Sequence, residues 1–213
     1  IKTINFWLIF SIIEIGDAMK TIEHNLKSEQ IVQKSRFITL LIRVHNKEEV
    51  RKAINDAKEE YPAATHYTYA YVLDIDMHAS DDGEPSGTAG NPMLNVLIKQ
   101  DLHFILAIVI RYFGGMKLGA GGLVRAYSGS VRNALEEAQI IELEPGYVIK
   151  IQYDYQDSKQ MNRLLENLEI KEKTFAESIE IIANGNQTDI QKLYENKVNY
   201  KVIGKTYIKK KTD

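Results

Sequence analysis

The sequence predicts a two-domain protein that contains both helices and strands. No internal repeat is visible in its 213 residues, but Glu144-Pro145-Gly146 interrupts the pattern, because proline and glycine there follow the end of a helical segment. The elements predicted after this break have the order βαββαβ, which is typical of ferredoxin-like domains. We therefore expect one domain over residues 19–143 and a ferredoxin-like domain over residues 146–213.

The first predicted domain begins with a strand at residues 37–44, which is rich in residues that favour strands. Asn46 and Glu49 have the spacing of a capping box, so a helix is expected to run from there to Glu60. Its expected core face consists of Val50, Ala53, Ile54 and Ala57. The further elements are a strand at 67–75, a loop at 76–91, a short helix at 92–99, a buried strand at 104–110, and a helix with Leu123, Val131, Leu135 and Ala138 on its core face.

The second predicted domain has six elements, which alternation and helical spacing indicate in turn. They are a strand at 147–153, a helix at 157–168, strands at 170–175 and 178–183, a helix at 188–195 and a strand at 198–208. Ferredoxin-like domains perform many functions, so this fold alone identifies none of them.

Residues 1–18 are excluded from the fold prediction. The apolar run at residues 4–15 is shorter than the roughly 20 residues of a membrane span and is broken by Asn5, Ser11 and Glu14. We interpret residues 1–18 as an uncertain extension that precedes a start at Met19, and a signal peptide is the alternative.

The composition restricts the classes of function. The chain is 44% apolar, enough to build a core, and contains no cysteine, which excludes disulfides, thiol catalysis and cysteine-ligated metal sites. Its net charge of -2 argues against a surface that is basic throughout. We expect a cytoplasmic protein with no membrane partner.

A glycine-rich basic segment at residues 111–127 follows the apolar strand and opens a helix. No Asp or Glu occurs from Leu102 to Leu135. Glycines let the backbone approach a ligand, and the start of a helix presents free amides to an anion. The predicted anion-binding or nucleic-acid-binding residues are Arg111, Gly114, Gly115, Lys117, Gly119, Gly121, Gly122 and Arg125. The alternative is that these glycines only pack the helix against the strand.

An acidic loop at residues 80–90 is the second candidate site. Asp81, Asp82 and Glu84 are weak candidates for metal ligands, because their spacing is not that of a calcium loop. His66 with Asp81 and Asp82 is a weak candidate for a catalytic centre, since no nucleophile motif accompanies it. A third possibility is that the acidic loop pairs with cations of the basic segment. We assign no catalytic residue, no metal and no cofactor.

Three blocks of this sequence resemble the signature of the YigZ/Impact family. They are ATHYTYAY at 64–71, SDDGEPSGTAGNP at 80–92 and IRYFGGMKLGAGGLVRAY at 110–127. The resemblance covers residues 19–141, and the later segment resembles the smaller C-terminal domain of bacterial members. It implies an α+β fold in which the N-terminal domain is like domain four of elongation factor G and a ribosomal small-subunit protein, while the ferredoxin-like domain is like domain five of that factor.

The resemblance also implies a function. Eukaryotic members of the family regulate translation, although this sequence shows no counterpart of their N-terminal partner-binding domain. We predict an RNA- or ribosome-associated regulator of translation without chemistry of its own, whose partners are RNA, the ribosome or a translation-related protein. The alternatives are a small phosphate-ligand-binding or hydrolytic enzyme, and a protein-interaction regulator. The metal ligands that a peptidase needs are not apparent.

Overall fold

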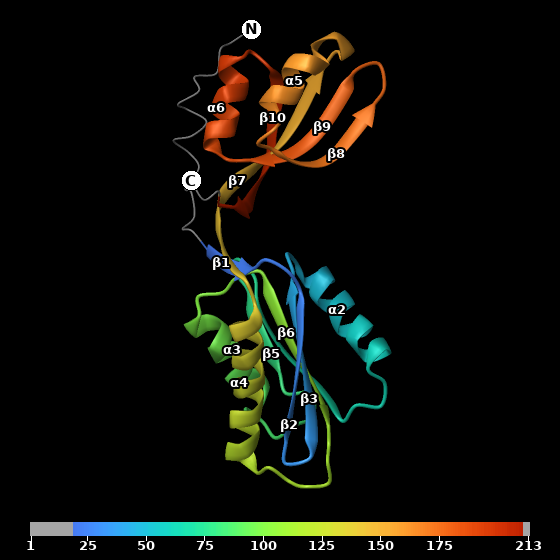
Figure 1. Cartoon of the computed structure of the whole chain (residues 1–213), viewed down its shortest axis with the longest axis vertical. Coiled ribbons are helices and arrows are strands. Elements are labelled where there is room, and N and C mark those ends of the chain that lie inside the picture. The colour runs from blue at the N-terminus through green and yellow to red at the C-terminus, as the bar shows by residue number, and fades with distance from the viewer. Residues whose placement is uncertain (1–18, 211–213) are drawn as a thin grey trace. The chain divides into compact units, whose positions relative to one another are not determined.

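The computed structural model describes residues 19–210, which form an α+β protein with two antiparallel sheets. The chain divides into two compact units, one over Met19–Ile141 and one from Glu142 onward. We describe each unit by itself (Figure 1). The predictions made for residues 1–18 lie outside the described residues. No helix within residues 19–210 combines the length and the apolar character needed to cross a membrane.

The first unit is built on an antiparallel sheet with the strand order β2-β3-β6-β4-β5. Its strands are β2 (Leu26–Val32), β3 (Ser35–Arg43), β4 (His66–Val72), β5 (Met77–Ser80) and β6 (Ile105–Tyr112). The central strand β6 is buried from Ile105 to Arg111, in agreement with its uninterrupted apolar sequence. A short strand, β1 (Met19–Ile22), lies beside the turn after α3, where the amide of His103 donates to the carbonyl of Lys20 at 2.8 Å.

Helices cover both faces of this sheet (Figure 1). The helix α2 (Lys47–Glu60) packs on one face, in a cluster with Ile38, Leu106 and Ile108. The helices α3 (Gly90–Lys99) and α4 (Ala120–Glu137) pack on the other, in a cluster with Phe37 and Val109. Alternate residues of β3 and β6 therefore belong to two separate cores.

The capping prediction for α2 is confirmed for the N-cap only, because the Glu49 carboxylate accepts from the amide of His45 and the side chain of Asn46 rather than from the Asn46 backbone amide. The side chain of Asn46 accepts from the amide of Glu49 at 2.9 Å, which satisfies one of the free amides at the start of the helix. The expected core face is also present, with Val50 and Ala57 buried and Ala53 and Ile54 packed partly buried against them.

The loop expected at residues 76–91 contains the strand β5, which the sequence prediction missed. The hairpin β2–β3 was also missed. Its two-residue turn consists of Gln33 and Lys34, both with positive φ, as the primed turns of tight hairpins require. Asn-Gly is the usual sequence for such a turn, so Gln-Lys gives no recognisable signal.

The second unit has an antiparallel sheet with the strand order β10-β7-β9-β8. Its elements occur in the predicted βαββαβ order: β7 (Ile140–Tyr153), η1 (Tyr155–Asp157) with α5 (Ser158–Leu164), β8 (Glu169–Phe175), β9 (Ile179–Gly185), α6 (Gln187–Glu195) and β10 (Asn199–Lys209). Apolar residues of β7, α5, β9 and α6 enclose a core of their own.

The predicted interruption of secondary structure at Glu144-Pro145-Gly146 is wrong. β7 begins at Ile140 and continues through Pro145, whose missing amide is tolerated there within the ladder to β10. Gly146 lies close to Ile208 and Gly185, so an added Cβ would be only 3.0 Å from the Ile208 side chain. The glycine is therefore required by a close approach within the sheet. The helix expected at 157–168 is also shorter than predicted, because α5 ends at Leu164.

Candidate functional site

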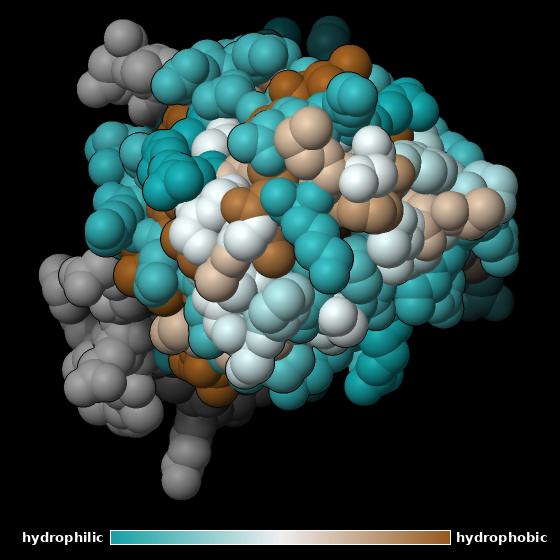
Figure 2. Space-filling view, turned by 90° about the horizontal axis from the view of Figure 1, so that it is seen from below, coloured by the Kyte–Doolittle hydropathy of each residue, from teal (hydrophilic) through white to brown (hydrophobic). Residues whose placement is uncertain are grey.

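The glycine-rich loop, which we define as residues 113–119, connects β6 to α4. It lies at the end of the first unit where the β2–β3 turn also lies (Figure 1). Gly115 and Gly119 have φ angles of 84° and 69°, which L-residues with side chains rarely adopt, and an added Cβ at either would meet open space. Phe113 and Met116 are each 46% exposed. Figure 2 views this end directly and shows weakly polar and hydrophobic residues in the centre with hydrophilic residues around them.

The start of α4 has the features of an anion site. Gly119 is the N-cap, no side chain caps the helix, and its first turn contains no acidic residue. Lys117 and Arg125 are exposed, and neither forms an ion pair within residues 19–210. The Arg125 guanidinium lies over this turn, because its Nη1 atom would be 3.7 Å from a Cβ added at Gly121.

A small cavity of about 240 Å³ lies beside this turn, between α4 and the β2–β3 hairpin. Its lining residues are Gln30, Val32, Gln33, Leu118, Gly122, Arg125 and Ala126. Gln30 fixes the hairpin to the helix, since its side-chain amide donates to the Ala126 carbonyl at 3.1 Å. The cavity therefore has one cation and a preformed wall.

Two of the predicted anion-binding residues have a different role. Arg111 is 5% exposed and pairs with the carboxylate of Glu84, so it is not free to meet an external anion. Gly114 is required for packing, because a Cβ there would lie 1.9 Å from the carbonyl oxygen of Lys34. Gly114 therefore packs, but against the β2–β3 turn rather than between helix and strand as the alternative supposed. The candidate anion site is reduced to Gly115, Lys117, Gly119, Gly121, Gly122 and Arg125.

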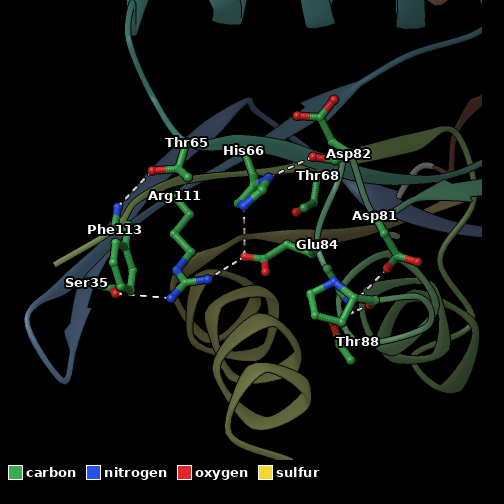
Figure 3. A network of polar contacts seen from close by, with 12 residues as sticks. Ser35, Thr65, His66, Thr68, Asp81, Asp82, Glu84, Thr88, Arg111 and Phe113 are labelled. Carbon is green, nitrogen blue, oxygen red and sulfur yellow. Dashed lines mark hydrogen bonds and ion pairs between the residues drawn. The ribbon is translucent and has the colours of Figure 1, made fainter. Parts of the chain in front are cut away.

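Glu84 is the centre of a buried polar network (Figure 3). Its Oε1 atom accepts from Arg111 Nη1 at 2.5 Å and from the Tyr127 hydroxyl at 2.7 Å. The Glu84 and Arg111 side chains are only 3% and 6% exposed. Arg111 also donates to the Ser35 hydroxyl, at 3.3 Å. An uncompensated charge would be costly at this depth, so each member of the network depends on the others.

Tyr127 joins the network as a neutral donor. Burial, and then its hydrogen bond to Glu84, raises the pKa of the Tyr127 phenol above its usual value. The ring also packs edge-on against Phe37, with the centroids 5.3 Å apart. The network thereby connects α4, the acidic loop and β6 through a single carboxylate.

Asp81 organises the acidic loop. Its carboxylate accepts from the amides of Gly87, Ala89 and Gly90 at 2.7, 3.0 and 2.8 Å, which fixes the loop at the start of α3. Burial raises the pKa of Asp81, but these three hydrogen bonds outweigh it, and the pKa lies below its usual value. The carboxylate is therefore ionised and fully engaged in holding backbone.

The other acidic candidates are likewise engaged. Asp82 accepts from the amide of Tyr67 at 2.6 Å, while Glu84 pairs with Arg111. No cluster of three or more possible metal ligands occurs within residues 19–210. The charge-pairing interpretation of the acidic loop is thus confirmed for Glu84 with Arg111, whereas neither Lys117 nor Arg125 takes part in such a pair within these residues.

His66 lies between Asp82 and Glu84 of the acidic loop (Figure 3). Its Nδ1 atom is 2.8 Å from the carbonyl oxygen of Asp82, which can only accept, so Nδ1 carries the proton. Nε2 faces Glu84 Oε1 at 3.8 Å. The nearby hydroxyls serve the loop itself, since Thr88 donates to the Pro85 carbonyl and Ser80 accepts from the amide of Asp82. The structure does not gather the three catalytic candidates at one point, because His66 contacts the backbone of Asp82 while the Asp81 and Asp82 carboxylates bond to backbone amides of the loop and of β4.

Sequence reasoning missed three contributors to this region. The Ser35 hydroxyl accepts hydrogen bonds from the Arg111 guanidinium and from the amide of Gly114. The Tyr127 hydroxyl donates to Glu84, and the backbone of Lys34 packs against Gly114. Ser35 and Lys34 lie far from the glycine loop in sequence and meet it only through the pairing of β3 with β6. No local sequence pattern identifies such an approach.

Comparison with known proteins agrees with the resemblance. Residues 33–135 match the family model of the Impact N-terminal domain. The chain is 42% identical over 165 residues to the IMPACT family member YvyE of Bacillus subtilis, covering 75% of this chain and 76% of that protein. It is 38% identical over 170 residues to an IMPACT family member of Haemophilus influenzae, covering 76% and 77% of the two chains. A crystal structure of a hypothetical protein superposes with a TM-score of 0.67 at 27% identity, over 88% of this chain and 98% of that one.

Proposed function

This chain belongs to the Impact family, and from that premise we propose that it binds RNA or a ribosomal surface and modulates translation without chemistry of its own. The proposed binding surface is the glycine-rich loop with the first turn of α4. The observation that carries the proposal is the uncapped, acid-free start of α4 beside Lys117 and Arg125, two cations without a carboxylate partner in the described chain.

The surrounding surface fits a nucleic acid. Phe113 is exposed, and its ring rests on the Arg111 guanidinium, whose carbon is 5.5 Å from the ring centroid. A ring held in this way offers its exposed face to an unstacked base, while the cations bind phosphates. The likeness of the two units to domains four and five of elongation factor G is part of the same proposal, and a cytoplasmic location follows from it.

The test compares the salt dependence of RNA binding. We expect Lys117→Ala with Arg125→Ala to weaken binding of a labelled single-stranded RNA whatever its sequence. The slope of log affinity against log salt should flatten by about 0.7 for each phosphate that the variant no longer neutralises. The control is Lys159→Ala with Lys201→Ala, which removes two exposed cations of the second unit. An unchanged slope in the loop variant, or an equal change in the control, would contradict the proposal.

A second function is supported by the apolar surface that Phe113 and Met116 expose beside the cations. The same end of the first unit would then be a docking patch for a translation-related protein. Phe113→Ala separates the two functions, because base stacking predicts a reduction of about 1–3 kcal/mol in RNA binding free energy. A protein patch predicts unchanged RNA binding and the disappearance of a ribosome or protein complex on sedimentation.

A further inference from the structure

The helices α3 and α4 lie side by side on one face of the first sheet (Figure 1) and leave a groove between them. Two cavities, of about 360 and 430 Å³, form this α3–α4 groove and share Gln100 and Arg132 in their walls. Its apolar lining consists of Pro92, Val96, Leu102, Val124, Leu135 and Ile140. The groove thus consists of two adjoining cavities with apolar residues in their walls, and neither cavity is lined by Lys117 or Arg125.

Positive charge dominates the rim of the groove. Lys20, Lys99 and Arg132 line it and are exposed, and none of the three forms an ion pair within residues 19–210. Glu136 is the single acidic residue among the described lining residues. Because burial of apolar area favours a ligand with apolar groups and the free cations favour negative charge, the groove is complementary to a ligand that has both.

The lining chemistry distinguishes a peptide from a nucleic acid. No aromatic side chain occurs among the lining residues that the structure describes, so the groove offers no platform on which a base could stack. Amide side chains, from Asn91, Asn95 and Gln100, are present and can bond to a peptide backbone. Aliphatic pockets beside unpaired cations match leucine-like anchors beside carboxylates.

We propose that the α3–α4 groove is a docking site for an acidic amphipathic segment of a protein partner. Apolar residues of the segment occupy the two cavities, and its carboxylates pair with Lys99 and Arg132. This site goes beyond the proposed RNA-binding surface and is independent of it. The protein would then join a nucleic-acid surface and a protein partner through two separate faces of one unit.

The test uses the full chain and a fluorescein-labelled peptide in which leucines recur at helical spacing between glutamates. We expect Lys99→Glu with Arg132→Glu to weaken binding of this peptide by on the order of tenfold or more, measured by fluorescence anisotropy. Lys159→Glu with Lys201→Glu makes the same change in net charge away from the groove and should bind like the wild type. Replacing the glutamates of the peptide with glutamine should abolish the difference.

Further measurements keep the result interpretable. Amide shifts of the wild-type protein should move at Lys99 and Arg132 when the peptide is added, whatever the fold of the variants. Lys117→Ala with Arg125→Ala should leave peptide binding unchanged, which separates this site from the RNA site. Absence of peptide binding, or equal weakening in both charge-reversal variants, overturns the proposal. Weaker binding of single-stranded RNA in the groove variant, with no effect on the peptide, would assign the groove to nucleic acid instead.

Discussion

Single residues of the first unit decide whether a charge serves the fold or a ligand. Arg111 and Arg125 both belong to the basic segment, yet Arg111 is buried against Glu84 while Arg125 is exposed at the start of α4. Their different roles follow from position: Arg111 lies near the end of β6, where the strand still pairs with both of its neighbours, whereas Arg125 is on the outer side of a helix. Residue type alone predicted the same role for both.

Substitution of Glu84 tests the buried pair. Glu84→Gln removes the negative charge but keeps the shape, leaving the Arg111 charge uncompensated, so we expect a decrease of about 3–5 kcal/mol in the free energy of unfolding, measured with urea. Glu29→Gln is the matched control, because it breaks an exposed arginine pair at 2.7 Å and should cost less than about 1 kcal/mol. Equal decreases in the two variants would show that the Glu84 pair contributes no more than a surface ion pair.

At the scale of elements, local signals predicted much of the fold. The N-cap of α2, the apolar run of β6 and the βαββαβ order of the second unit appear as expected, because each depends on neighbouring residues. The β2–β3 turn and β5 were missed, since Gln33-Lys34 carries no turn signal and β5 lies in a segment dominated by loop residues. Pro145 misled the prediction because proline usually interrupts a strand, whereas here β7 continues through it.

The candidate site was predictable only in part for the same reason. The glycine and basic residues of the loop are contiguous in sequence and were found, but which glycine packs and which is open depends on strands far apart in the chain. A Cβ added at Gly114 would overlap the backbone of Lys34, whereas a Cβ added at Gly115 would have no atom within 4 Å. Gly121 has only the flexible end of Arg125 near it, so it is the best position at which to separate packing from binding.

Two glycine substitutions therefore give opposite expectations. Gly114→Ala should destabilise the fold by about 1–3 kcal/mol, because the methyl group overlaps the Lys34 carbonyl. Gly121→Val should melt near the wild-type temperature, since a side chain there is sterically tolerated, yet it should bind RNA more weakly because it covers the free amides of α4. Thermal melting and RNA binding are measured on both. If Gly121→Val stays folded and binds RNA like the wild type, the α4 amides do not contact the ligand.

At the scale of the whole molecule, each unit has its own hydrophobic core. The first unit contains two clusters, one on each face of its sheet, and the second unit contains a third. Both proposed binding surfaces lie in the first unit. In the second unit the strand β8 lies at an edge of the sheet, and each of its residues is exposed. Charged residues along β8, such as Glu172 and Lys173, protect that edge from pairing with other chains.

The domain prediction is tested by cutting the chain at the boundary between the units. A chain from Met19 to Ile141 retains both clusters of the first unit, so we expect it to unfold in one cooperative transition with urea. Its m-value should be smaller than that of the full chain in proportion to the surface exposed. Far-ultraviolet circular dichroism and tyrosine fluorescence follow the transition, because the only tryptophan, Trp7, is absent from the shorter chain.

The complementary chain from Glu142 to Asp213 is the control, since it retains the cluster formed by β7, α5, β9 and α6 and should fold separately. If both pieces unfold cooperatively and their probes give coincident transitions, each unit is a domain. If the first piece stays soluble but unfolds gradually, without a midpoint shared by both probes, residues beyond Ile141 complete its core. The hydrophobic clusters of both units would then belong to one cooperative fold, and the predicted division into two domains would be wrong.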